Sequence, residues 1–163
     1  MAEASGGINR WLVLGGFLVI TFAASAIGGL FTSVSVGTWY QEIAKPSFTP
    51  PSWVFGPVWT TLYALMAIAA WLVWDRVGFA VGAVALTLYG VQLLLNVAWS
   101  GLFFGMRSPA LGSLCIVVLW IAILATIVAF WRIHPVSGAL LVPYILWVSY
   151  ASVLTFTLWR LNA

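Results

Sequence analysis

Charge is scarce in this chain of 163 residues, which holds six Lys and Arg, three Asp and Glu, and one His. Charged residues make up about a quarter of an ordinary soluble domain, so a share of 6% excludes a water-soluble domain of this size. Three acidic residues leave little room for hydrolytic chemistry, and one Cys with one His gives no spacing for a metal site. We therefore expect no metal and no required cofactor.

Hydrophobic residues make up 64% of the chain, and five apolar stretches are each long enough for a membrane span. Crossing the roughly 30 Å hydrocarbon core takes about 20 helical residues. The stretches lie at about 11–31, 55–74, 79–104, 109–131 and 138–159. The connections after the first are short, so neighbouring spans should be antiparallel. The sequence predicts an all-α, multi-pass integral membrane protein, with residues 1–163 forming one five-helix transmembrane bundle.

The charges that are present lie outside these stretches or at their ends, where a charged group avoids a cost of about 2.5–3.5 kcal/mol. With five spans, one side receives Arg10, Arg76 and Arg132 and the other Lys45, Arg107 and Arg160. The positive-inside rule therefore gives no orientation. The net charge of +3 forms no basic patch, so we expect no nucleic-acid partner.

The first connection, WYQEIAKPSFTPPSWVFGPVW at 39–59, is rich in aromatic residues and proline. Proline fixes φ and removes a backbone donor, which argues against a plain helix over this segment. An irregular segment this apolar should fold back onto the bundle rather than extend into water. We expect residues 39–57 to form a lid over an internal cavity.

Two amides lie at membrane depth in the third span, at Gln92 and Asn96. They share a helical face with Trp99 and Phe103. An unsatisfied amide in lipid costs several kcal/mol, so both must face protein or water. One interpretation is a polar contact for a ligand, and the other is an interhelical hydrogen bond worth about 0.6 kcal/mol.

Tryptophan is abundant, with 11 residues. Several lie at span ends, as is usual at membrane interfaces. Trp99 and Trp147 do not, and Trp39, Trp53 and Trp59 surround the proline-rich connection. Such rings suit a flat, apolar ligand, although ordinary aromatic packing is the competing interpretation.

Small residues form a second face of the third span. Small side chains allow close helix approach in lipid, so this face suits a contact between subunits, although such residues are also common in membrane helices that form no dimer. It comprises Gly82, Ala83, Leu86 and Gly90.

Three long motifs resemble the TspO/MBR family, the translocator proteins formerly called peripheral-type benzodiazepine receptors. They are WYQEIAKPSFTPPSWVFGPVWTTLYALM (39–66), QLLLNVAWSGLFFG (92–105) and PYILWVSYASVLTFTLWRLN (143–162). The resemblance extends over essentially the whole chain. It implies a five-helix bundle in the membrane, a homodimer, and a pocket closed by the loop after the first helix.

The resemblance also implies ligands and site residues. The family binds porphyrins such as protoporphyrin IX, as well as sterols and synthetic isoquinolines and benzodiazepines. Carried over by motif, Pro51 and Trp53 would shape the lid. The pocket would be lined by Trp39, Phe55, Tyr63, Asn96, Trp99, Trp147, Ala151 and Leu154.

The chain departs from the family in its sterol-recognition pattern. Leu154 and Arg160 are in place, but Phe156 occupies the tyrosine position and lacks the hydroxyl. Such patterns are weak indicators of sterol binding. The missing tyrosine and the short polar N-terminus favour a bacterial member, whereas an animal member would reside in the outer mitochondrial membrane.

Three functions follow from the resemblance. The first is a translocator or receptor that binds porphyrin and acts in tetrapyrrole transport or regulation. The second is light-dependent oxidative degradation of the bound porphyrin, with Trp39 or Trp147 supplying electrons. The third is a sensor whose ligand occupancy alters contact with a partner protein. The sequence does not choose among them.

Overall fold

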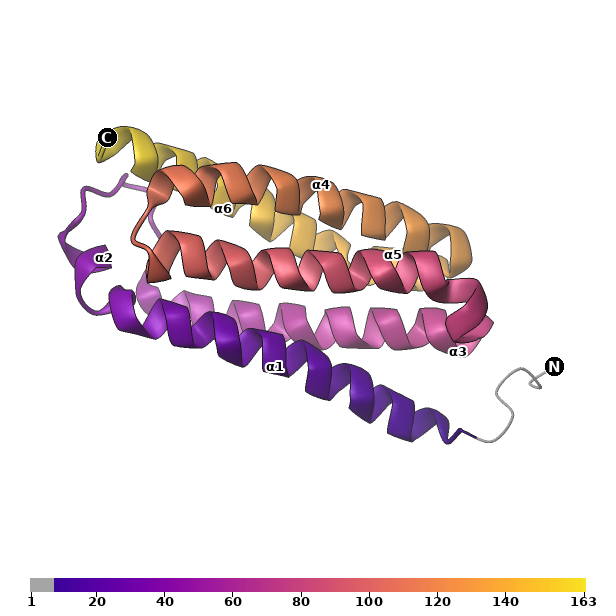
Figure 1. The fold of residues 1–163 in the computed structure, drawn as a ribbon. Helices are drawn as coiled ribbons and strands as arrows, with labels where there is room; N and C mark the ends of the chain where they lie inside the picture. Colours follow the sequence, from indigo (N-terminus) through magenta and orange to yellow (C-terminus); the bar gives the residue numbers. More distant parts are fainter. Residues whose placement is uncertain (1–7) are drawn as a thin grey trace.

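The computed structural model describes residues 8–163 and is helical almost throughout this range (Figure 1). The long helices run side by side as a bundle. Their bounds are α1 Arg10–Val36, α2 Trp39–Glu42, α3 Ser52–Ser100, the π-helix η1 Gly101–Gly105, α4 Pro109–Ile133, α5 Pro135–Leu140 and α6 Val142–Leu161. Residues 1–7 of the predicted domain lie outside the described range.

The helix α3 contains two of the five predicted spans. It runs on through η1 for 54 residues, but Gly78 within it has φ 73° and ψ −179°, and there the chain turns back on itself (Figure 1). We call 52–77 the first arm and 79–105 the second arm. The predicted four-residue connection at 75–78 is therefore reduced to one glycine, because only glycine adopts this backbone conformation readily.

The segment before α3 only partly follows the prediction. The chain is irregular between the short helix α2 and Pro51, as expected for a proline-rich stretch. The expectation of irregular backbone is wrong from Ser52 onward, since α3 begins there and includes Pro57 in its second turn. Pro51 fits just outside the first turn, and Pro57 removes a single helical donor while the neighbouring turns persist.

The C-terminal span is assembled from two helices. Pro135 and Pro143 stand in the first turns of α5 and α6, where a missing N–H costs least. The backbone carbonyl of His134 accepts from the N–H groups of Ser137 and Gly138 and so begins α5. Together α5 and α6 give an apolar helix of 27 residues, somewhat longer than the predicted 138–159.

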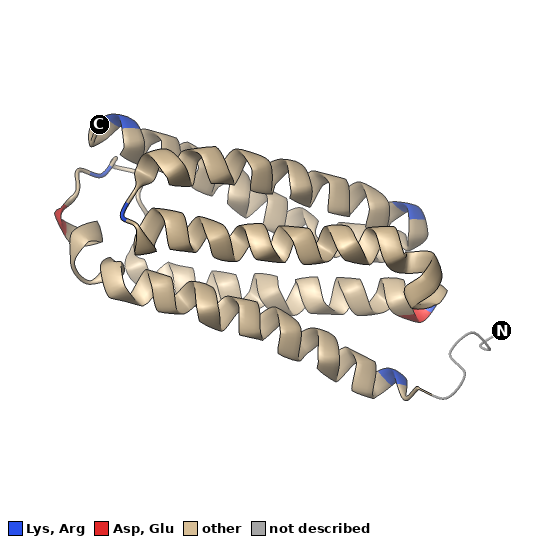
Figure 2. Cartoon of the chain, in the orientation of Figure 1, with Lys and Arg blue, Asp and Glu red and all other residues tan. Residues whose placement is uncertain are grey.

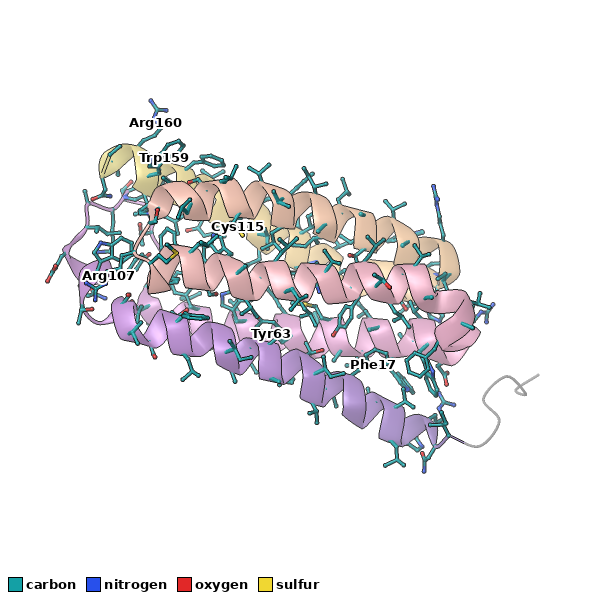
Figure 3. The ribbon with its side chains drawn as sticks, viewed as in Figure 1. Phe17, Tyr63, Arg107, Cys115, Trp159 and Arg160 are labelled. Atoms are coloured by element: carbon teal, nitrogen blue, oxygen red, sulfur yellow. The ribbon has the colours of Figure 1, made fainter. Side chains whose placement is uncertain are left out.

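Four helices in the described range are long and apolar enough to cross a membrane, and the second of these is the doubled-back α3 with η1. The prediction of an all-α five-helix bundle is confirmed. The charged residues collect at the two ends of the bundle (Figure 2). Arg10 pairs with Asp75 at 3.0 Å, and Arg107 and Arg160 lie at the end where the chain terminates (Figure 3). The chain is an integral membrane protein.

Candidate functional site

A cavity of about 430 Å³ lies between α1 and the two arms of α3. The second half of α1 forms one side, and the start of the first arm forms the other. The end of the second arm, with Phe104 of η1, closes the back, and Tyr40 of α2 lies at the end near the 37–51 connection. The cavity is therefore built where α1 and the first arm separate enough to leave space between them.

Four of the predicted pocket residues line this cavity: Phe55, Tyr63, Asn96 and Trp99. Phe55 and Tyr63 stand two turns apart on the first arm, while Asn96 and Trp99 face them from the second arm. Tyr63 lies on the side of the first arm next to α1, where its ring centroid is 6.4 Å from that of Phe22 (Figure 3). Of the helical face predicted for Gln92, Asn96, Trp99 and Phe103, Trp99 is half-buried and the other three are at most 2% exposed.

The other four predicted pocket residues lie behind the cavity wall or away from it. The Trp147 ring packs against Phe55 with centroids 6.0 Å apart. Trp39 meets the ring of Phe103 at 5.8 Å, and Phe103 in turn stacks on Trp99 at 5.4 Å. The remaining two pack elsewhere: Leu154 clusters with Tyr40, Phe103, Phe104 and Leu158, and Ala151 packs on the main core.

The predicted lid is hydrogen-bonded to α6 and to Asn162, which caps the end of α6. Asn162 accepts from the Ala44 N–H at 2.9 Å and donates to the Ala44 carbonyl at 3.0 Å. Tyr150 donates to the carbonyl of Phe48 at 2.6 Å. Pro51 and Trp53 do not appear among the described wall residues, and Trp53 is 75% exposed. Other residues of the predicted lid 39–57 line the cavity, namely Tyr40, Ser52, Phe55 and Gly56.

The cavity wall is aromatic, and one of its rings carries an unpaired hydrogen-bond donor. Trp59, Phe55, Trp99 and Phe104 supply flat rings. The indole Nε1 of Trp99 is buried without a hydrogen-bond partner, and so is that of Trp147 behind Phe55. A buried donor left unpaired costs about 1–3 kcal/mol, so an acceptor on a ligand would be stabilised here.

Polar side chains meet at the inner end of the cavity. Tyr63 donates to Asn96 Oδ1 at 3.0 Å, and Asn96 Nδ2 donates to Tyr144 at 2.7 Å. The two interpretations of Asn96 are thus compatible, because it makes interhelical hydrogen bonds and lines the cavity. Gln92 accepts from Tyr144 at 2.8 Å and stays within the core.

Sequence reasoning missed the contribution of α1. Small and hydroxyl residues from this helix form much of the wall, and they recur at helical spacing. They are Ser25, Gly28, Gly29, Thr32 and Ser33. That spacing was the available signal, although Gly15, Gly16, Thr21 and Ser35 of the same helix are equally small or polar and do not line the cavity.

The predicted dimer face and sterol pattern lie apart from the cavity. Gly82 faces its own chain, where an added Cβ would be 3.6 Å from Val73, whereas Ala83 is exposed. In the sterol pattern Phe156 is 36% exposed, and Arg160 projects from the end of α6 (Figure 3). Both sets mix buried and exposed positions, since Gly82 and Leu154 are buried, and the dimer contact and sterol binding stay predictions.

A second hollow of about 320 Å³ lies between α4 and α6 and is more open. It is lined by Val117, Trp120, Ile121, Ser149 and Ser152, and none of the predicted site residues is among these described positions. Trp120 Nε1 donates to Ser149 at 2.8 Å, so its polar groups are already paired. The cavity between α1 and α3 is therefore the better candidate site.

Comparison with known proteins agrees with the motifs. The TspO/MBR family model matches residues 17–160. The chain is 43% identical over 155 residues to the tryptophan-rich protein TspO of Chlorobaculum tepidum, covering 93% of this chain and 94% of that one. It is 40% identical over 151 residues to Protein CrtK of Rhodobacter capsulatus, covering 90% of each. Identity to the human translocator protein is 37% over 154 residues, covering 93% and 91%.

Proposed function

Because the chain belongs to the TspO/MBR family, we propose that it binds porphyrins of the protoporphyrin IX class in the cavity between α1 and α3. In this role it acts in tetrapyrrole transport or regulation. The observation that carries the proposal is the Trp99 ring, which lines an aromatic cavity with its buried N–H unpaired. A flat macrocycle stacks on such rings, and a heteroatom or carboxyl oxygen accepts the N–H.

The size and charge of the site support this proposal. A cavity of about 430 Å³ is within the range of about 300–1,000 Å³ for small-molecule sites. The Lys45 ammonium lies 5.1 Å from the ring centroid of Tyr40, which is a wall residue at the end near the bilayer surface. Propionates directed toward that end would meet the Lys45 ammonium.

The test is a titration with protoporphyrin IX in lipid nanodiscs in the dark, following the shift of the porphyrin Soret band. Trp99→Phe keeps the flat ring but removes the donor. We expect its affinity to fall by about 2- to 10-fold, the equivalent of one neutral hydrogen bond. Trp53→Phe is the matched control, since Trp53 is exposed and lies off the wall. Equal binding by the wild type and Trp99→Phe would contradict the assigned pocket.

Light-dependent degradation of bound porphyrin is the second candidate. The observation that favours it is the contact of the Trp147 ring with Phe55 of the wall, which places an oxidisable indole one ring away from the cavity. Under illumination with dioxygen as oxidant, we expect Trp147→Phe to bind porphyrin nearly as well as the wild type but to bleach it more slowly. Parallel loss of binding and bleaching would reject a separate photochemical role for Trp147.

A further inference from the structure

Five side chains at the inner end of the cavity form one continuous hydrogen-bonded chain. Tyr63 donates to Asn96 at 3.0 Å, Asn96 to Tyr144 at 2.7 Å, and Tyr144 to Gln92 Oε1 at 2.8 Å. Gln92 Nε2 then donates to the Met66 sulfur at 3.7 Å. This series of hydrogen bonds joins both arms of α3 to α6, and each of the five side chains is at most 4% exposed.

The thioether of Met66 fixes the direction of this chain. A thioether carries no hydrogen and can only accept, so Gln92 must present its NH₂ group to Met66. Its carbonyl oxygen then faces Tyr144 and can only accept. Tyr144 therefore donates its one proton to the Gln92 carbonyl, and its oxygen accepts a hydrogen bond from the N–H of Asn96. The Asn96 carbonyl is left to accept the proton of Tyr63.

Tyr63 consequently has no proton to offer the cavity. A phenol has one O–H donor, and its oxygen can also accept. Hydrogen bonds that all run in one direction polarise one another, so a hydroxyl that donates becomes a better acceptor. Among the five residues of the chain, only Tyr63 and Asn96 line the cavity. The chain thus presents the acceptor oxygen of Tyr63 beside the second N–H of Asn96.

We infer that Tyr63 and Asn96 form a subsite for a hydroxyl group on the inner, uncharged edge of a planar ligand. The hydroxyl donates to Tyr63 and accepts from Asn96, whereas a carboxylate would set its lone pairs against the oxygen of Tyr63. This inference rests on the proposed function in taking the cavity as a binding site. It adds the chemistry of the inner edge, opposite the end where Lys45 lies.

The direct test compares 2-naphthol with 2-methoxynaphthalene, which cannot donate. Binding to the protein in nanodiscs is measured by fluorescence, with partitioning into empty nanodiscs subtracted. We expect the naphthol to bind about tenfold more tightly, as one satisfied hydrogen bond allows. Tyr63→Phe removes the acceptor, and in this variant the two affinities should become equal. A wild-type protein without the preference, or a Tyr63→Phe variant that retains it, would overturn the inference.

Gln92→Leu tests whether the direction of the hydrogen bonds matters, because Gln92 orients Tyr144, Asn96 and Tyr63 without lining the cavity. Without Gln92, Tyr144 has no acceptor there and can donate to Asn96. The Asn96 side chain can then rotate so that its oxygen accepts from Tyr144 and its NH₂ group donates to Tyr63. The Tyr63 proton is then free for the cavity, and the preference for naphthol should fall to near unity. Thr126→Val is the control, since it removes a buried hydroxyl from α4, outside the described cavity wall. An unchanged preference in Gln92→Leu would overturn the directional argument.

Protoporphyrin IX titrated in the same nanodiscs separates the two proposals. Porphyrin binding without a naphthol preference would sustain the proposed function and reject the hydroxyl subsite. A naphthol preference without porphyrin binding would sustain the subsite and reject the proposed ligand. Binding of neither naphthol nor porphyrin would reject both.

Discussion

Gly112 of α4 shows how one residue can position the aromatic rings behind the cavity. A Cβ added at Gly112 would lie 2.8 Å from Cδ2 of Phe103 and 3.1 Å from its Cβ. Phe103 is 2% exposed and stacks on Trp99 with centroids 5.4 Å apart. The absence of a side chain at Gly112 is therefore what allows α4 to approach this ring.

We expect Gly112→Ala to displace Phe103 and to destabilise the fold by about 1–3 kcal/mol, as overpacking of a core does. Unfolding in mixed micelles with increasing SDS measures the change. Porphyrin affinity should also fall, because Trp99 loses its stacking partner. Gly90→Ala is the control, since nothing lies within 4 Å of the Cβ added there. Equal stability of Gly112→Ala and Gly90→Ala would contradict this role.

At this scale half of the eight predicted pocket residues line the cavity, and they are four of its 17 described wall residues. Asn96, Trp99, Phe55 and Tyr63 were recognisable because polar or aromatic residues stand out within apolar spans. Trp147 was predicted to line the pocket, but it lies one ring behind the wall. Spacing along a helix places a residue on a face, and only the packing of neighbouring helices determines whether another side chain covers it.

The turn within α3 depends on a single glycine. Gly78 has φ 73° and ψ −179°, a region that is essentially restricted to glycine. Trp74 and Phe79 pack across the turn with ring centroids 5.7 Å apart, so the two arms begin in contact. The register of Tyr63 opposite Asn96 is set from this point.

We expect Gly78→Ala to lower the free energy of unfolding by about 1–3 kcal/mol through backbone strain alone. No atom lies within 4 Å of the added Cβ, so a clash cannot cause the loss. Gly90→Ala, which changes a helical glycine in open space, should be neutral or stabilising by up to about 1 kcal/mol. SDS unfolding of the two variants separates backbone strain at Gly78 from the helix propensity of alanine. A Gly78→Ala variant as stable as the wild type would refute the role of backbone strain.

The spans were predicted better than their orientation about their own axes. Length and charge placement indicated the five-helix bundle, because a span must be long and nearly uncharged. The rotation of α1 was not predicted, since lipid is as apolar as the protein core and the outer face of a membrane helix resembles its inner face. The small residues Gly28 and Gly29 of α1 have helical spacing in the sequence, but the packing of α1 on α3 determines that they line the cavity.

Across the whole molecule, the connection 43–51 is joined to the C-terminal end of the chain. Asn162 bonds both backbone groups of Ala44, a residue 118 positions earlier, and Tyr150 bonds the carbonyl of Phe48. The composition of this connection indicated that it would fold back onto the bundle. No signal in the sequence identified α6 as its partner, because one asparagine near a chain end has no pattern of its own.

The attachment at Asn162 predicts how freely the connection moves. Asn162→Ala removes both bonds to Ala44 and should accelerate amide hydrogen exchange at Ala44 by at least about fivefold, since roughly 1 kcal/mol of protection is lost. Exchange followed by mass spectrometry on nanodisc-embedded protein measures this for a peptide spanning 43–49. Leu161→Ala is the control, because Leu161 is 50% exposed on the same turn. Porphyrin affinity should change little, since the described cavity wall includes Tyr40 and Ser52 but no residue between them. A large loss of affinity together with faster exchange would instead show that the 43–51 connection acts as a lid on the bound ligand.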